Sequence, residues 1–119
     1  MDVKPAEFFI MNVGNGKVHK VSGVVFKRKS RLLAACIRFY SDSFVWFTHD
    51  VKTGLCVDAS DYSPAADKAI ATFDEKIKRF NKAIPKEMRK HYAAMIKKAY
   101  DEAPEVKKQV FGGKRNVKT

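Results

Sequence analysis

The spacing of the apolar residues changes once along this chain, from alternation in the first half to a helical repeat in the second. Alternation is typical of strands with one face against a core, whereas spacings of three and four place apolar residues along one side of a helix. The change falls near Ser63-Pro64, a pair that favours a helix start because serine caps free N–H groups and proline fits the first turn. The pattern therefore predicts an α+β fold with the strands first.

The first half predicts an N-terminal antiparallel β-meander of four to five strands. The alternation is clearest in residues 31–40, where it divides the side chains between two faces. Gly14-Asn15-Gly16 predicts a tight hairpin turn, because Asn-Gly tolerates two positive φ angles. The basic residues 27–31 are expected to connect the second strand to the third. The strands are expected at residues 7–13, 17–26, 31–40, 44–49 and 55–59.

The second half predicts two C-terminal helices packed on one face of the meander. Pro85 ends the first helix and begins the second, which runs to about Glu102, and Pro104 closes it. Because Gly112 leads a basic segment without periodicity, residues 1–111 are expected to form a single α+β domain and residues 112–119 a mobile basic tail. The apolar stripes consist of Ala66, Ile70, Phe73, Ile77, Phe80 and Ile84 in the first helix, and of Met88, Tyr92, Met95, Ile96 and Ala99 in the second.

Positive charge is the feature that bears most directly on function. The chain has 24 Lys and Arg against 13 Asp and Glu, a formal net charge of +11, and such a balance attracts polyanions. Nucleic acid, DNA or RNA, is the favoured partner, and an acidic host protein is the alternative. No apolar run reaches the length of a membrane span and the first residues lack a signal-peptide pattern, so a cytoplasmic protein without a membrane partner is expected. The oligomeric state stays open, a homo-oligomer included.

The sequence lacks the motifs of catalysis and of cofactor binding. His19, His49 and His91 lie far apart, and no pair of His or Cys residues has the spacing that holds a metal ion. Neither a nucleophile elbow nor a glycine-rich phosphate loop is present. We therefore expect a binding protein rather than an enzyme, with no metal and no cofactor. Cys36 and Cys56 are expected to be structural thiols, and a bridge between adjacent strands stays open.

Residues 17–31 carry six Lys or Arg and no acid. On a hairpin, these side chains would hold phosphates, while the neighbouring sheet face would reach bases. The other interpretation is that the charges protect an edge strand from aggregation. The predicted contacts are Lys17, Lys20, Lys27, Arg28, Lys29 and Arg31 on the hairpin, and Arg38, Tyr40 and Trp46 on the sheet. A second candidate surface lies on the helices around Lys76, Arg79, Lys86, Arg89 and Lys90.

One set of residues in the first half consists of Ser22-Gly23-Val24, Lys29, the run from Leu33 to Arg38, and Val45-Trp46. This set resembles the core of an AP2-type DNA-binding domain, in which three strands enter the major groove and a helix packs behind them. The family has a Leu-Gly pair after its last strand, where this chain has Phe47-Thr48. The resemblance implies that Lys29, Arg38 and Trp46 face DNA.

Together these features predict a small, sequence-tolerant nucleic-acid-binding protein that contacts phosphates through its basic hairpin and bases through its sheet. The alternative is an inhibitor or adaptor of the phage or mobile-element type, which binds a host protein. A third hypothesis is a protein that sequesters an anionic nucleotide between sheet and helices. That hypothesis requires Arg and aromatic side chains to converge in a pocket.

The stripe of the first helix generates a test of the fold. Phe73→Ala and Ile77→Ala should each lower the free energy of unfolding by about 2–5 kcal/mol, because shortening a buried side chain leaves a cavity. Chemical denaturation measures the change. Stability equal to that of the unaltered protein would mean that the stripe is an interface rather than core.

Overall fold

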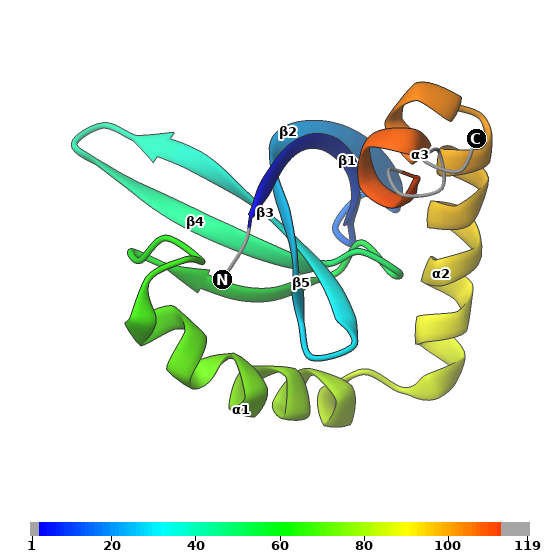
Figure 1. Cartoon of the computed structure of the whole chain (residues 1–119). Helices are drawn as coiled ribbons and strands as arrows, with labels where there is room; N and C mark the ends of the chain where they lie inside the picture. Colours follow the sequence, from blue (N-terminus) through cyan, green and yellow to red (C-terminus); the bar gives the residue numbers. More distant parts are fainter. Residues whose placement is uncertain (1–2, 113–119) are drawn as a thin grey trace.

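A five-stranded antiparallel sheet forms the first half of the chain, followed by three helices (Figure 1). The computed structural model describes residues 3–112, and of residues 67 and 68 only the backbone. The strands lie in the sheet in the order in which they follow one another along the chain, which confirms the α+β class and the meander. Their bounds are β1 (Lys4–Asn12), β2 (Lys17–Arg28), β3 (Arg31–Tyr40), β4 (Ser43–Asp50) and β5 (Cys56–Ser60).

The prediction of two helices was wrong by one. The helices are α1 (Asp67–Ala83), α2 (Lys86–Asp101) and α3 (Pro104–Phe111). Pro104 does not only close α2 but occupies the first position of α3, where its fixed φ and missing N–H cost nothing. Ser63-Pro64, in contrast, does not begin α1. The Ser63 hydroxyl instead accepts a hydrogen bond of 3.2 Å from the N–H of Ala65 within a turn. Gly112 caps α3, and the rest of the predicted tail lies outside the described residues.

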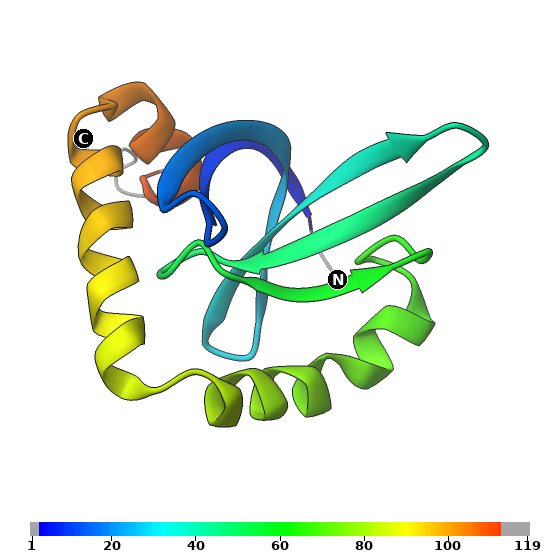
Figure 2. The same ribbon diagram turned by 180° about the vertical axis from the view of Figure 1, so that it is seen from behind.

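The helices do not share one face of the sheet, contrary to the prediction. Figures 1 and 2 show that α1 runs along one side of the sheet while α2 and α3 lie at the end where β1 curves over. Leu33 and Ala35 of β3 pack with Phe73 of α1 in one buried cluster. Ala34 and Cys36 belong to a second cluster with β1, α2 and α3. Both faces of the first half of β3 are therefore buried.

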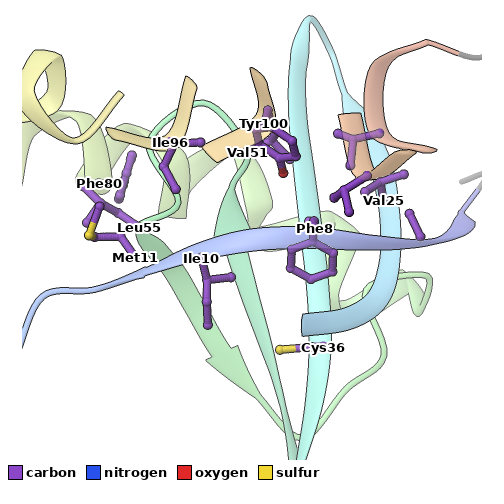
Figure 3. Packing of buried hydrophobic residues seen from close by; sticks show 14 residues of the cluster. Phe8, Ile10, Met11, Val25, Cys36, Val51, Leu55, Phe80, Ile96 and Tyr100 are labelled. Atoms are coloured by element: carbon purple, nitrogen blue, oxygen red, sulfur yellow. The ribbon is translucent and has the colours of Figure 1, made fainter. Parts of the chain in front are cut away.

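The second cluster holds most of the core and joins elements from both halves of the chain (Figure 3). Phe8 of β1, Ile96 and Tyr100 of α2 are each at most 2% exposed. α3 adds Val106 and Val110. Of the stripe predicted for α2, Met88 is 44% exposed and lies outside the core, because only the later turns of α2 reach the sheet.

The outer edge of β1 is closed by hydrogen bonds rather than left open. The N–H of Glu7 donates to Gln109 Oε1 over 2.7 Å and the N–H of Phe9 to Tyr100 Oη over 3.1 Å. The N–H of Met11 donates to the carbonyl of Gly54 over 2.9 Å. Since an open edge is a template for pairing with another chain, these contacts remove one site of aggregation and curve the sheet towards the β4–β5 turn.

Two turns differ from their sequence predictions. The loop between β1 and β2 has four residues, Val13–Gly16, and only Gly16 has a positive φ, of 69°. The two-residue turn is Lys29-Ser30, between β2 and β3, with Lys29 at a φ of 58°. Residues 27–31 were predicted to connect the two strands, but Lys27 and Arg28 belong to the end of β2.

The far end of the β3–β4 hairpin projects from the sheet (Figure 1). The pairing of β2 with β3 ends at Val24 and Ala35, and the pairing of β4 with β5 ends at Trp46 and Ser60. Residues 37–45 therefore form a two-stranded extension with no further strand on either side, which we call the β3–β4 ribbon.

His49 is a buried titratable group in β4. It is 4% exposed, its Nδ1 donates to the Gly54 carbonyl over 3.1 Å, and its Nε2 has no partner among the described residues. Burial lowers the pKa of His49 to about 4, against the opposing effect of the Gly54 hydrogen bond and with a smaller contribution from the charge of Arg38. The side chain is therefore neutral when the protein is folded near pH 7.

This burial predicts acid sensitivity. In the unfolded chain His49 takes up a proton at its ordinary pKa of about 6.5, so below that pH the unfolded state binds more protons than the folded state. The free energy of unfolding should fall by about 3 kcal/mol from this group between pH 6.5 and pH 4. Urea denaturation across this range measures the fall. His49→Gln should make the profile flatter, whereas His91→Gln, at an exposed position, should leave it unchanged.

Candidate nucleic-acid interface

The residues predicted to contact nucleic acid lie in three separate places. Lys17 and Lys20 are at the first end of the 12-residue β2, and Lys27 is near its last end. Arg38 and Tyr40 are on the β3–β4 ribbon. The hairpin predicted as one basic surface is therefore divided along the length of β2.

Carboxylates of distant elements pair with most of the basic side chains around the β2–β3 turn. Asp74 of α1 accepts Arg28 Nη2 over 2.9 Å and contacts Lys29 Nζ over 3.2 Å. Asp50 of β4 accepts Arg31 Nη1 over 3.1 Å. Lys27 is exposed and has no acidic partner among the side chains that the structure describes. These ion pairs lower the positive potential of the turn and hold the Arg28 and Arg31 side chains in place.

The predicted base-contacting residues do not share a face. Successive side chains of a strand alternate, so Trp46, opposite Ile37, lies on the face covered by α1 and is half-buried against Leu33 and its neighbours. Arg38 lies on the other face, with its guanidinium 4.8 Å from the centre of the Phe47 ring. Tyr40, on the face of Arg38, is 53% exposed.

The ribbon also exposes aromatic side chains that the sequence analysis did not select. Phe39 is 78% exposed and Phe44 is 46% exposed. Their rings lie opposite each other across the two strands, with centres 6.3 Å apart. Without the tertiary structure, both residues resembled core positions of alternating strands.

A basic groove of about 1050 Å³ lies between α2 and the turns that follow β2 and β4. Leu32, Val51, Ala93 and Ala94 are among the residues of its apolar floor. Seven Lys or Arg and two Asp line it, a net charge of +5. The charged lining residues are Arg31, Lys52, Lys86, Arg89, Lys90, Lys97 and Lys107, with Asp50 and Asp101.

Some of these charges are paired inside the groove. Asp101 accepts Lys97 over 2.9 Å and Lys107 over 2.7 Å, and these hydrogen bonds hold the pKa of Asp101 below its usual value. Arg31 pairs with Asp50. Among the side chains that the structure describes, the other four cations have no acidic partner; these are Lys52, Lys86, Arg89 and Lys90.

Two unpaired cations of α2 are placed where a helix least favours them. Lys86 and Arg89 lie in the first turn of α2, beside the positive end of the helix dipole, and Lys90 follows directly. Only Glu87 supplies an acid in the first turn, and Pro85 offers no side-chain cap. Such an arrangement lowers helix stability unless an anion binds there. Local conflicts of this kind are expected at functional sites.

Asp50 holds one side of the groove in place. Its side chain is 4% exposed and accepts the N–H of Thr53 over 3.1 Å and the Thr53 hydroxyl over 2.7 Å, in addition to Arg31. A buried carboxylate is stable only when donors surround it. Asp50 therefore fixes both the β4–β5 turn and the direction of Arg31.

The described residues contain no group of three His, Cys, Asp or Glu that could hold a metal ion. Cys36 lies in β3 and Cys56 in β5, with β4 between them, and both are free thiols. They are therefore not on adjacent strands, as a bridge required. Among residues 3–112, no helix is long and apolar enough to cross a membrane.

Comparison with protein families, with curated proteins and with solved structures finds no match to this chain. The likeness to AP2-type domains is therefore carried only by the residues named above. The site is defined by its own geometry. From the sequence, Lys86, Arg89 and Lys90 were predicted only as members of a second surface. Lys52 was missed, because a single lysine in a turn gives no signal of the charges that will surround it.

The role of Asp50 can be tested by removing its charge. Asp50→Asn should lower the free energy of unfolding by about 3–5 kcal/mol, because it leaves Arg31 without its carboxylate and places an amide among donors. Denaturation in urea at pH 7 measures the change. Asp42→Asn, in an exposed turn, is the control and should change stability by less than about 0.5 kcal/mol. Equal small effects would show that Asp50 is not required for the turn.

Proposed function

We propose that this protein binds nucleic acid, with the groove beside α2 as its phosphate-binding surface. The observation that carries the proposal is the set of unpaired cations, Lys52, Lys86, Arg89 and Lys90, which converge on one groove although two of them are unfavourable for their own helix. A chain of phosphates would contact them together, releasing counterions at each contact. The proposed interface is thus on α2 rather than on the hairpin.

An aromatic ring at the groove supports nucleic acid over a simple anion. Phe111 of α3 lines the groove and is 44% exposed. Tyr100 holds it edge-on, with ring centres 5.1 Å apart, so that part of the Phe111 ring is open to a base. Stacking on aromatic rings is how sequence-tolerant proteins hold single strands. Lysines for phosphates and a ring for a base fit this mode of binding.

The β3–β4 ribbon favours a second candidate function, docking to a host protein in the manner of a small inhibitor or adaptor. Its exposed side chains include Phe39, Tyr40 and Phe44, and residues 37–45 contain only Arg38 and Asp42 as charges. Aromatic enrichment and depletion of charge are typical of protein–protein interfaces. In this function, Phe39→Ser with Phe44→Ser would abolish binding and the groove variants would not.

The proposed interface is tested by removing its lysines and leaving its arginines. Lys52→Gln, Lys86→Gln and Lys90→Gln together should weaken binding to oligonucleotides of any sequence and lower the slope of log affinity against log salt by about two to three units, since each lost phosphate contact removes about 0.7–0.9. Fluorescence anisotropy at several salt concentrations measures both quantities.

The matched control removes the same charge elsewhere. Lys4→Gln, Lys17→Gln and Lys20→Gln alter three exposed lysines of β1 and β2, two of them in the predicted hairpin site. The control protein should keep the salt slope of the wild type. Equal losses in both triple variants would mean that net charge, and not the groove, determines binding, and a loss in the control alone would return the interface to the hairpin.

A further inference from the structure

Two arginine side chains that line the groove come from different elements and meet at one amide oxygen. Arg31 Nη2 and Arg89 Nη1 both donate to Asn81 Oδ1, over 3.1 and 3.3 Å. The three residues come from β3, α2 and α1, so only the folded chain brings them together. Guanidinium groups that share one acceptor repel each other, because both are positively charged. An anion between them would replace this repulsion with attraction.

The Arg31 side chain is held in position by a buried carboxylate. Its Nη1 donates to Asp50 Oδ1 over 3.1 Å, and Asp50 is in turn held by the N–H and hydroxyl of Thr53. The Asp50 side chain is 4% exposed, so this support lies in the interior. A side chain held in this way loses little conformational freedom when it binds a ligand.

Arg89 has no carboxylate partner among the described side chains, which exclude that of Asp67. It belongs to the beginning of α2, where no side chain caps the first N–H groups. Uncapped N–H groups at a helix N-terminus attract anions. They therefore add to the positive potential at this end of the groove.

We infer that Arg31 and Arg89, held together by Asn81, form a discrete binding site for a phosphate group. The inference rests on the proposed function and deepens it, since the site would hold one phosphate of the nucleic acid at a fixed place in the groove. Phosphate oxygens point in tetrahedral directions and accept from two guanidinium groups at once, and the planar fork of arginine matches pairs of these oxygens. A lysine offers no such fork.

Thermal unfolding with inorganic phosphate tests the site without nucleic acid. The melting temperature should rise with phosphate concentration, and by more than in sodium chloride of equal ionic strength, because a ligand of the folded state stabilises it. Arg89→Gln should weaken the apparent phosphate affinity by about tenfold or more, and Arg89→Lys should give an intermediate value because it keeps the charge and loses the fork. Lys108→Gln, which removes one positive charge at an exposed position of α3 outside the groove lining, is the control and should respond as the wild type does.

Oligonucleotides with and without a 5′ phosphate identify the source of the phosphate group. If the 5′ phosphate raises the affinity of the wild type and Arg89→Gln abolishes this gain, the result supports the site and assigns it to the end of a nucleic-acid chain. If Arg89→Gln weakens the binding of both oligonucleotides equally, the result supports the site and assigns it to an internal phosphate. A melting temperature that follows ionic strength alone overturns the inference, as does an Arg89→Gln protein with the phosphate response of the wild type; the lysine variants would then still test the proposed function. Phosphate binding without any oligonucleotide binding would keep the site and overturn the proposed function.

Discussion

A carboxylate removed from water must be surrounded by donors, and Asp50 obtains them from both sides of a turn. Thr53 supplies an N–H and a hydroxyl, and Arg31 supplies a charged donor from β3. The turn that Asp50 closes then presents the Gly54 carbonyl to the N–H of Met11 and to His49. Burying this charge without partners would cost several kcal/mol. The contacts of Asp50 therefore hold together the start of β3, the end of β4, the β4–β5 turn and one side of the groove.

The outer edge of β1 is closed by the same turn together with the C-terminal helices. Gly54, Tyr100 and Gln109 each accept a backbone N–H from β1. These acceptors come from the β4–β5 turn, α2 and α3. The helices therefore complete a sheet that would otherwise have an exposed edge, and in doing so place the first turn of α2 beside the β2–β3 turn, where the groove forms.

The groove is a place where the chain departs from what helix stability favours. Cations at the beginning of a helix oppose its dipole, yet Lys86 and Arg89 lie in the first turn of α2. Around the sheet, several cations are paired, as Arg28 is with Asp74 and Lys76 with Asp58. The convergence of four cations without a described acidic partner on one groove is the physical basis for the proposal that the binding surface lies at α2.

The class of fold could be predicted from local patterns, since alternation and the helical repeat each depend on neighbouring residues. The strands of the meander and the buried stripe through Phe73 were predicted in this way, and α3 was missed because Pro104 was interpreted only as the end of α2. The charge of +11 likewise indicated an anionic partner.

What the sequence by itself determined was therefore the elements, their order and the sign of the charge. The tertiary structure decided which charges remain unpaired, because ion pairs such as Arg28 with Asp74 join residues far apart in the chain. It also decided which aromatic residues are exposed, since Phe39 and Phe44 lie beyond the reach of β2 and β5. Pattern is a local property of a chain, whereas the neutralisation of a charge or the covering of a ring depends on what the fold brings next to it.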